Sequence, residues 1–359
     1  MPTILAICEY GTVSGGENSL MAGIPLLRER GYQLEVLCPA GSDLAERLAR
    51  LNVRTWPLTW RDAAEKTLPL EHRRTLLLEA IQRIGPDIVH ANSLSVSRAL
   101  GPLTDDLAIP TVGHIRDIVN TSGQVMRDVS RLSRVLCVSA ATRDHHVRRG
   151  LDTEKSFVLY NGVELPEPVA TQSADPLVVA AVGQLVQRKG IDVLIGAMPA
   201  IVARHPQIEL RIYGERYSVK GEAIEYVEAI ARRIAELGLE SHVRLMGFHP
   251  DIQTCWPEID LLVHPARQEP FGRVLLEAAA AGIPIVATDV GGTREMFPNQ
   301  EATLVPPDDA AGLAAAVAEL VDSPMLRQSR GHLGRERAGY FSCARYTEGL
   351  VRHYEELRG

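Results

Sequence analysis

The chain has 359 residues, of which 45% are hydrophobic and 23% are charged, and its formal net charge is −7 at pH 7. A chain of this length exceeds one ordinary hydrophobic core and suits two domains of roughly 150 to 200 residues each. Its ordinary composition does not indicate disorder, and the acidic balance without runs of basic and aromatic residues excludes a nucleic-acid-binding protein.

The five cysteines are far apart and never form a Cys-x-x-Cys pair. That usage is typical of buried thiols in a reducing compartment and predicts neither a zinc site nor a disulfide framework. The sequence runs from Met1 directly into an apolar, strand-like segment, and no apolar run reaches the roughly 18 residues that a membrane-spanning helix needs. We therefore expect a cytoplasmic protein whose contact with the inner face of a membrane is at most peripheral.

Short apolar runs alternate with longer amphipathic stretches through the first half of the chain. Residues 18–30 and 72–84 have the spacing of amphipathic helices, and seven runs between turn residues predict strands. These runs are TILAICE, QLEVLCP, NVRTWPL, DIVHAN, PTVGHI, RVLCVS and SFVLYN. Strands that alternate with helices indicate a parallel sheet covered on both faces.

The alternation stops at residues 163–176, which are rich in proline and acidic side chains and predict an interdomain linker. It then resumes with six further apolar runs, each followed by a helical stretch. These are LVVAAVG, IELRIYG, HVRLMGF, IDLLVHP, IPIVATD and ATLVPP. From about Pro324 onward the pattern is only helical.

Together these patterns predict an α/β protein with two facing, doubly wound, Rossmann-like domains. The N-terminal domain is expected at residues 1–165, the C-terminal domain at 166–345, and a helix at 346–359 is expected to cross back to the first domain. Open α/β sheets bind ligands beyond the carboxyl ends of their strands, so we expect both ligand-binding edges to face one interdomain cleft.

A glycine pair follows the first predicted strand and opens a helix. Gly15 and Gly16 lack a Cβ, so the backbone can approach a phosphate or a sugar closely at the positive end of the helix. A plain strand-to-helix turn explains the pair equally well. The dinucleotide-binding pattern G-x-G-x-x-G is absent from this turn, which argues against a nicotinamide or flavin cofactor.

The second domain opens with a comparable turn. Gly183 ends its first predicted strand, and Arg188 and Lys189 precede the next helix. At about 4 Å and an effective dielectric constant near 20, a lysine attracts a unit negative charge by ~4 kcal/mol before desolvation, so this pair suits a diphosphate. Ordinary surface charge is the alternative.

Glu269 and Glu277 flank the start of a predicted helix in EPFGRVLLE. The backbone N–H groups of this turn and the helix dipole can bind an anion. If the helix starts near Phe271, the spacing of the two carboxylates places them roughly on the same side, a little over two helical turns apart. Both would then line one cleft.

The chain carries a further ordered set of segments: VLCVSAATRDHHVRRG, VLYNGVE, GQLVQRKG, IYGE, LMGF and EPFGRVLLEAAAAGIPIVAT. With the glycine pair, these segments resemble the retaining glycosyltransferases of family 4, which have the GT-B fold, over roughly residues 1 to 345. The most specific segment is EPFGRVLLEAAAAGIP, which matches the family's Glu-x7-Glu element. The resemblance implies transfer of a sugar from a nucleoside diphosphate sugar, with retention at the anomeric carbon.

The resemblance also implies which residues bind the donor. Glu269 would meet the sugar and Glu277 the ribose, while Lys189, helped by Arg188, would hold the diphosphate. Gly16 would let the first-domain loop close over that diphosphate. The implied donor-binding set is Gly15, Gly16, Arg188, Lys189, Gly214, Phe248, Glu269, Phe271, Gly272 and Glu277.

Four members of this set are implied to act mainly through backbone groups. Phe271 and Gly272 would contact the sugar and phosphate, and Gly214 and Phe248 match the turns that hold the base. Because the family contacts the base in this way, uracil, guanine and adenine all stay open, as does the sugar. The chain departs from many relatives at Gln184, where they have arginine, so stabilisation of the leaving group is expected to rest mainly on Lys189 unless Arg188 compensates.

In the first domain, His114 matches a position where relatives often place a histidine near the reacting carbon. The resemblance makes His114 a catalytic residue together with Lys189 and Glu269, either orienting a sugar hydroxyl or sharing developing charge; a purely structural histidine is the alternative. Arg116 and Asp117 are the expected residues on the acceptor side.

No Asp-x-Asp motif occurs in the sequence. We therefore expect fixed cations and helix N-termini to stabilise the departing diphosphate, with neither a metal nor another cofactor. The expected partners are a nucleotide sugar and a saccharide or lipid-linked saccharide acceptor, as in polysaccharide biosynthesis. Two rival functions stay open: a nucleotide-sugar epimerase of the same fold, and a non-catalytic subunit that binds a nucleotide sugar.

Overall fold

The computed structural model describes residues 1–62, 66–169, 177–216 and 221–359. The chain forms two compact units, here called the first unit (Met1–Gly162 with Cys343–Gly359) and the second unit (Val163–Ser342). The domain boundaries expected after residues 165 and 345 lie close to these divisions, and positions 170–176 of the expected linker lie outside the described residues. Each unit is an α/β structure built on one parallel sheet, as the sequence predicted.

The first unit holds a seven-stranded sheet in the order β3-β2-β1-β4-β5-β6-β7. Its strands are β1 (Thr3–Ile7), β2 (Gln33–Cys38), β3 (Arg54–Pro57), β4 (Ile88–Ala91), β5 (Thr111–Ile115), β6 (Arg134–Cys137) and β7 (Ser156–Val158). Each lies inside one predicted run. In β1, Ile4 and Ala6 join one hydrophobic core while Leu5 and Ile7 join another, because successive side chains of a strand point to opposite faces. Both faces of this sheet are therefore buried.

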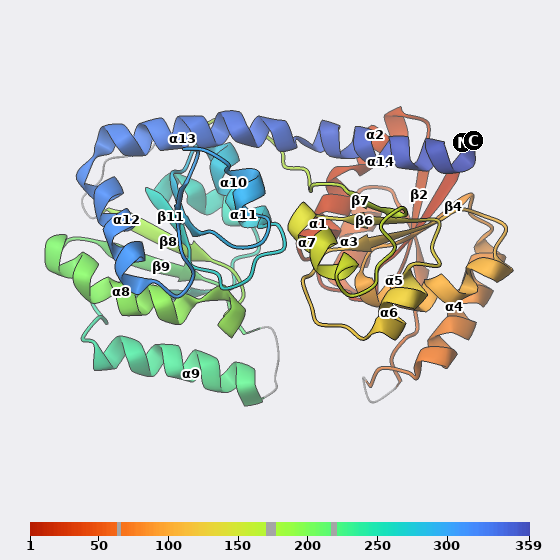
Figure 1. Ribbon diagram of the computed structural model, residues 1–359, viewed down its shortest axis with the longest axis horizontal. Coiled ribbons are helices and arrows are strands. Elements are labelled where there is room, and N and C mark those ends of the chain that lie inside the picture. The colour runs from red at the N-terminus through yellow and green to blue at the C-terminus, as the bar shows by residue number, and fades with distance from the viewer. Residues whose placement is uncertain (63–65, 170–176, 217–220) are drawn as a thin grey trace. The chain divides into compact units, whose positions relative to one another are not determined.

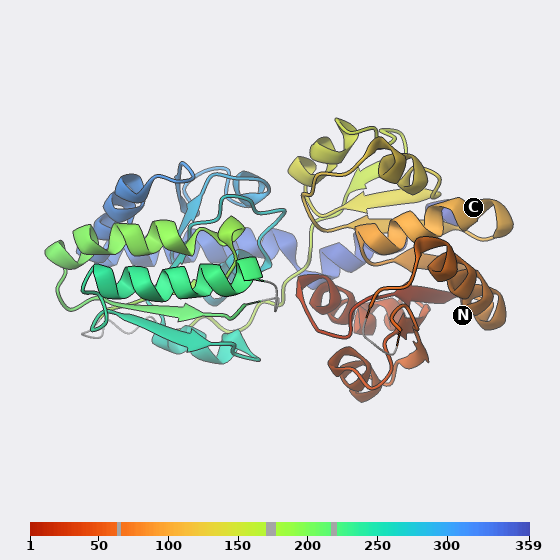
Figure 2. The same ribbon diagram turned by 90° about the horizontal axis from the view of Figure 1, so that it is seen from below.

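Helices cover these two faces (Figures 1 and 2). They are α1 (Gly15–Ala22), α2 (Ile24–Glu29), α3 (Asp43–Arg50), α4 (Leu70–Ile84), α5 (Leu94–Leu100), α6 (Gly123–Val129), α7 (Ala140–Val147) and α14 (Cys343–Arg358), with a 3-10 turn η1 (Gly101–Asp106). Side chains of α1, α2, α3 and α14 pack into the core on one face, and those of α4, α5 and α6 pack into the core on the other.

The helix predicted at residues 18–30 is two helices in the structure. α1 ends at Ala22, Gly23 follows, and Pro25 stands in the first turn of α2. A proline is tolerated there because the first N–H groups of a helix have no partner within the helix. The apolar spacing continues across Gly23, so the hydrophobic pattern alone does not reveal the break.

The helix α14 completes the core of the first unit. Its side chains Tyr346, Leu350, Val351 and Tyr354 are buried among those of β1 and β2, and the helix runs beside α2 (Figure 1). The hydroxyl of Tyr354 lies 2.6 Å from Nδ1 of His90, on β4. A segment far along the sequence thus supplies part of the interior of the first sheet.

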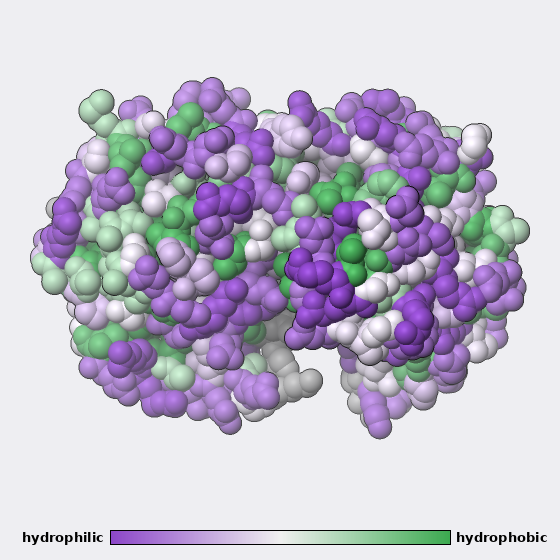
Figure 3. Space-filling view, viewed as in Figure 1, coloured by the Kyte–Doolittle hydropathy of each residue, from purple (hydrophilic) through white to green (hydrophobic). Residues whose placement is uncertain are grey.

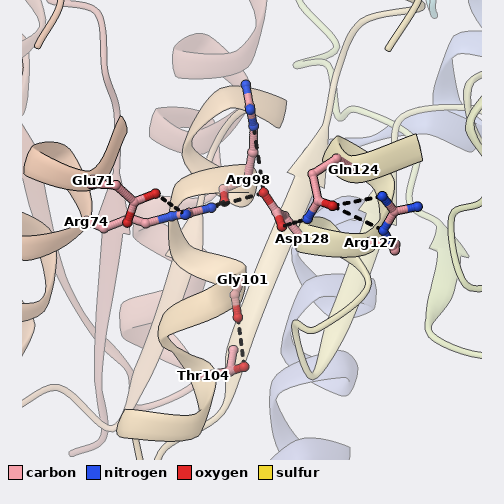
Figure 4. A network of polar contacts seen from close by, with 8 residues as sticks. All are labelled: Glu71, Arg74, Arg98, Gly101, Thr104, Gln124, Arg127 and Asp128. Atoms are coloured by element: carbon pink, nitrogen blue, oxygen red, sulfur yellow. Dashed lines mark hydrogen bonds and ion pairs between the residues drawn. The ribbon is translucent and has the colours of Figure 1, made fainter. Parts of the chain in front are cut away.

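A buried carboxylate joins three helices on the opposite face (Figure 4). Asp128 in α6 accepts hydrogen bonds from Arg74 of α4 at 3.0 Å and from Gln124 at 2.7 Å, and it lies 3.8 Å from Nε of Arg98 in α5. The Asp128 side chain is only 9% exposed. Glu71 also pairs with Arg74, at 2.6 Å, but its side chain is 80% exposed.

The second unit holds a six-stranded sheet in the order β10-β9-β8-β11-β12-β13. Its strands are β8 (Val178–Val182), β9 (Glu209–Tyr213), β10 (Val243–Gly247), β11 (Leu261–His264), β12 (Ile285–Thr288) and β13 (Thr303–Val305). Its helices are α8 (Ile191–Arg204), α9 (Gly221–Glu236), α10 (Arg273–Ala281), α11 (Thr293–Met296), α12 (Ala310–Asp322) and α13 (Pro324–Ala338), with 3-10 turns η2 (Gln187–Lys189), η3 (Ile252–Glu258) and η4 (Gly339–Phe341). The helices α8, α9 and α12 cover one face and α10 and α13 the other (Figure 1).

The face shown in Figure 3 is largely hydrophilic, and its hydrophobic side chains lie in separate areas. Exposed apolar side chains gather at the end of β10, where Leu245, Met246 and Phe248 are 43%, 45% and 63% exposed. Within the ranges that the structure describes, no helix is both long enough and apolar enough to cross a membrane.

Candidate functional site

Each sheet has a point at which the strand order changes direction. It lies between β1 and β4 in the first unit and between β8 and β11 in the second. Open α/β sheets bind ligands at such a point, beyond the carboxyl ends of the two strands. The predicted glycine pair follows β1, and the loops that carry Lys189 and Glu269 follow β8 and β11. The predicted residues therefore mark one candidate subsite in each unit.

In the second unit, Glu269 is held in the loop between β11 and α10. It is only 5% exposed, and its Oε2 accepts a hydrogen bond from Nζ of Lys189 at 2.5 Å and lies 2.7 Å from Nε2 of His264. Lys189 and His264 both contact Oε2. The other carboxylate oxygen, Oε1, has no hydrogen bond within the described residues. Parallel pairing of β8 with β11 brings Lys189 beside Glu269 across 80 positions of sequence.

The charges of this cluster follow from burial and from these contacts. Burial raises the pKa of Glu269. The positive charge of Lys189 and the hydrogen bond from His264 together lower this pKa by a larger amount, so it ends well below the usual range of a glutamate. Burial lowers the pKa of His264, and the charge of Lys189 lowers it again. A neutral imidazole and an ionised carboxylate can share a hydrogen bond only if the imidazole proton is on Nε2. The cluster thus consists of a cation, an anion and a neutral donor.

The start of α10 differs from the prediction. Gly272 has φ 95° and ψ 60°, in the left-handed region, and the helix begins at Arg273 rather than near Phe271. Glu269 therefore precedes the helix while Glu277 lies within it, so helical spacing does not relate the positions of the two carboxylates. Glu277 pairs instead with Arg273, with 2.6 Å between Oε1 and Nε. Phe271 is 2% exposed, so its ring is buried.

Arg188 precedes Lys189 in η2 and ties the two loops together. Its carbonyl oxygen accepts hydrogen bonds from the backbone N–H groups of Arg267 at 2.8 Å and Gln268 at 3.3 Å. The loop after β11 is thus fixed against the turn after β8, which keeps Lys189 close to Glu269. Among the described residues, no set of three or more His, Cys, Asp or Glu side chains is arranged to hold a metal ion.

The residues predicted to hold the base lie at the neighbouring strand ends. Gly214 follows β9, and its N–H donates to the carbonyl of Gly247, the last residue of β10, at 2.7 Å. Phe248 comes next in the chain and is 63% exposed. The structure therefore places Gly214 at the end of β9, next to β8, and Phe248 one strand farther, after β10, while the Lys189–Glu269 pair follows β8 and β11.

In the first unit, Arg116 is the centre of the predicted acceptor side. It follows β5 and donates to Oδ1 of Asn161 at 2.8 Å and to Oδ1 of Asn92 at 2.8 Å, and its Nη2 lies 3.1 Å from Nδ1 of His114. All three acceptors are neutral groups. A Cβ on Gly16 would come within 2.7 Å of Cδ of Arg116, so a glycine at that position makes room for the arginine stem.

His114 lies in the interior of the first unit, with 0% of its surface exposed. Burial and then the charge of Arg116 lower its pKa, so the ring is neutral, and it packs against His90 with 5.5 Å between ring centroids. Asp117 is exposed, and its carbonyl oxygen lies 2.9 Å from Nε2 of His146. Arg116 and Asp117 lie beyond the carboxyl end of β5, whereas His114 lies within the strand.

Three contributors to the two subsites were not identified from the sequence. Ser14 caps α1, which begins at Gly15, and its N–H donates to Glu17 at 3.1 Å; the Ser-x-x-Glu spacing is a readable capping-box signal. Asn92 and His264 stand at the carboxyl ends of β4 and β11. A polar side chain at such a strand end, next to a predicted binding loop, is the signal that could have found them.

Comparisons with known proteins agree with this architecture. Residues 13–167 match the model described as Glycosyltransferase Family 4, and residues 167–337 match the model described as Glycosyl transferases group 1. The chain is 30% identical over 271 residues to a glycogen synthase of Mycobacterium tuberculosis (strain CDC 1551 / Oshkosh), an alignment that covers 70% of this chain and 64% of that protein. The chain thus spans slightly less than two thirds of this relative.

Two further proteins match over nearly their whole length. The lipopolysaccharide core biosynthesis mannosyltransferase LpsB of Rhizobium meliloti is 25% identical, with 96% of this chain and 95% of that protein covered. The crystal structure of HepE from Anabaena in complex with UDP and glucose has a TM-score of 0.86 at 22% identity, with 99% of each chain covered. The likeness to HepE shows the shared fold. Because the two family models match consecutive parts of the chain, the chain belongs to the glycosyltransferases of family 4, with the group 1 region in its second half.

Proposed function

We propose that the protein is a retaining glycosyltransferase that moves a sugar from a nucleoside diphosphate sugar to a hydroxyl of a saccharide or lipid-linked saccharide, without a metal ion. The observation that carries the proposal is the buried Lys189–Glu269 pair at the point where the second sheet changes direction. It combines a cation for a diphosphate with a carboxylate for sugar hydroxyls. Membership of the glycosyltransferase family supports the same reaction.

The donor would be held by groups of the second unit. Lys189 and Arg188 attract the diphosphate, and the backbone of Phe271 and Gly272 faces it at the start of α10. Oε1 of Glu269, which has no hydrogen bond within the described residues, accepts from a sugar hydroxyl. Glu277 takes the ribose, and Gly214 and Phe248 the base.

In the transfer step, the bond between the anomeric carbon and the diphosphate oxygen breaks while the acceptor oxygen forms a bond on the same face of the sugar. The acceptor hydroxyl gives its proton to the departing diphosphate, so charge and atoms balance. The fixed cations stabilise the charge that develops on the leaving group. In the first unit, Arg116 and Asp117 face the acceptor, and His114 acts by orienting Arg116.

The proposal predicts that Lys189→Ala and Glu277→Ala each lower turnover, by about 100-fold or more for the lysine, while the fold is retained. The measurement is release of nucleoside diphosphate and transfer of labelled sugar, with a panel of UDP, GDP and ADP sugars chosen after a thermal-shift screen. Circular dichroism checks the fold of each variant. Full activity of both variants on the best donor would contradict the assignment of the site.

Two exposed residues of α9 provide matched controls. Arg232 and Glu228 lie 3.8 Å apart with side chains 64% and 61% exposed, and an exposed ion pair of this kind contributes little to stability. Arg232→Ala and Glu228→Ala remove the same charges as the site variants and are expected to leave turnover unchanged.

The same assay separates the rival functions. An epimerase would release a free or nucleotide-linked epimer without an acceptor, and a non-catalytic subunit would bind the donor without turnover against any acceptor. Activity that survives EDTA supports the proposed independence of metal, and activity that chelation abolishes would overturn it. A cytoplasmic location is supported by the five free cysteines, which are typical of a reducing compartment.

A further inference from the structure

We propose that His264 is a positioning residue that fixes the carboxylate of Glu269 for the donor sugar. This inference rests on the proposed function, because it concerns how the sugar-binding carboxylate is held. His264 is the last residue of β11 and is 2% exposed. It lies too deep to be reached by a sugar, so it would act only through Glu269.

The geometry distinguishes the two oxygens of the carboxylate. Oε2 of Glu269 takes both the Lys189 and the His264 contacts, at 2.5 Å and 2.7 Å. A carboxylate held by one donor can still turn about its Cγ–Cδ bond, whereas two donors that reach one oxygen from the turn η2 and from the end of β11 define where the other oxygen points. Oε1 is thereby presented to a ligand in one orientation, which lowers the cost of ordering it on binding.

The histidine has a second consequence, which concerns Lys189. If the diphosphate of a donor draws Lys189 toward itself, Glu269 loses its ionic partner in a buried position, which is costly. The Nε2–H of His264 then still satisfies Oε2. A neutral donor behind the carboxylate thus lets the lysine be shared with the diphosphate while the carboxylate stays in place.

Three substitutions separate this role from a general effect on packing. His264→Leu keeps an apolar volume but removes the donor, and we expect turnover with a nucleotide sugar to fall by ~10- to 100-fold, the range of a hydrogen bond to a charged group. His264→Gln places an amide N–H at nearly the reach of Nε2 and should recover most of that loss. His264→Asn has the same chemistry but is too short, so it should not recover it.

Control measurements use a ligand without the sugar and a histidine outside the cluster. In His264→Leu the affinity for the nucleoside diphosphate alone should fall clearly less than the affinity for the nucleotide sugar, because only the sugar contacts Oε1. His242, whose Nδ1 lies 3.2 Å from the carbonyl of Ile208, is the matched control, and His242→Leu should retain wild-type turnover. Equal losses of nucleoside diphosphate and nucleotide-sugar affinity in His264→Leu would show a merely structural role and overturn the proposal.

A double-mutant cycle tests whether His264 acts through Glu269. Adding His264→Leu to Glu269→Gln should cost less than about threefold, because the group that His264 positions is already changed. If the two losses multiply in full, the histidine acts by another route and the proposal is wrong.

A readout without activity keeps this inference separate from the proposed function. In the intact protein, ¹⁵N chemical shifts should show the proton of His264 on Nε2 at pH 7, and Glu269→Gln should shift that signal. If the wild-type protein turns over no donor but this signal is found, the proposed function fails and the positioning contact stands. A proton on Nδ1, or a signal that Glu269→Gln leaves unchanged, overturns the contact itself.

Discussion

Three buried histidines are in the same electrostatic situation although they lie in different parts of the chain. His90, His114 and His264 are 1%, 0% and 2% exposed, and burial lowers the pKa of each, to about 3 for His90. Each ring is neutral in the folded protein but takes up a proton in the unfolded chain below pH 6.5. Below pH 6.5 the unfolded chain therefore binds protons that the folded protein does not. The free energy of unfolding is highest above that pH and decreases as the pH falls toward the pKa of each ring in the folded protein.

This pH dependence can be tested at His90. Between pH 7 and pH 5, one such histidine should lower the free energy of unfolding by about 2 kcal/mol. His90→Gln removes the titrating ring, so the urea midpoint of this variant should depend less on pH over that interval than the wild-type midpoint does. His72, which is exposed, provides the control variant His72→Gln. An unchanged pH dependence in His90→Gln would contradict the explanation.

At the residue scale, the sequence predicted the members of the second-unit cluster better than their contacts. Lys189 and Glu269 were each identified from their turns and from the family resemblance. The ion pair between Lys189 and Glu269 forms because β8 pairs with β11. A local sequence pattern does not predict which strands pair. His264 was missed because a single histidine at the end of an apolar strand gives no periodic signal. Its partner Glu269 lies in the loop that follows β11, and that loop places the carboxylate beside the histidine ring.

At the scale of elements, the Asp128 cluster shows how charge fixes the packing of helices (Figure 4). The strands were predictable because parallel strands buried on both faces form continuous apolar runs. Helix ends were less predictable: α10 begins two positions later than expected because Gly272 adopts a left-handed conformation, and α2 is separated from α1 at Gly23. Such ends depend on single backbone angles, to which hydrophobic spacing is insensitive.

Asp128 and Glu71 form a matched pair for testing the helix cluster. Asp128→Ala should lower the free energy of unfolding by about 3 kcal/mol, because it leaves Arg74 without its buried partner. Glu71→Ala removes an exposed partner of the same arginine and should cost less than about 1 kcal/mol. Urea denaturation followed by circular dichroism compares the two, and equal losses would show that burial does not set the strength of these contacts.

At the scale of the whole molecule, the first unit is assembled from two segments that are distant in sequence. The order of the apolar runs was sufficient to predict two α/β sheets, whereas the place of α14 is set by tertiary contacts that bury Tyr346, Leu350, Val351 and Tyr354 against the first sheet. An amphipathic face shows that a helix is covered and leaves open which sheet covers it. The packing of α14 is thus the fold-level feature that depends most on tertiary contacts.

Truncation of one α14 side chain tests its part in the first unit. Leu350 is 0% exposed, and Leu350→Ala should lower the free energy of unfolding by about 2–5 kcal/mol. Trp56 and Trp60 report on the first unit by fluorescence in a Trp256→Phe background. Val119→Ala, at a first-unit side chain that is 42% exposed, is the control and should change stability by no more than about 0.5 kcal/mol. A similar midpoint for both variants would contradict the role of α14.

The divided first unit has a consequence for synthesis on the ribosome. Residues 163–342 form one uninterrupted stretch and can reach their native contacts as soon as they emerge, whereas residues 1–162 must wait for the segment that begins at Cys343. Throughout translation of the intervening stretch, the nascent chain therefore carries an unfinished apolar surface, the kind of surface that chaperones bind. Ribosome-bound chains arrested before and after residue 359 emerges should accordingly differ in the protease resistance of residues 1–162.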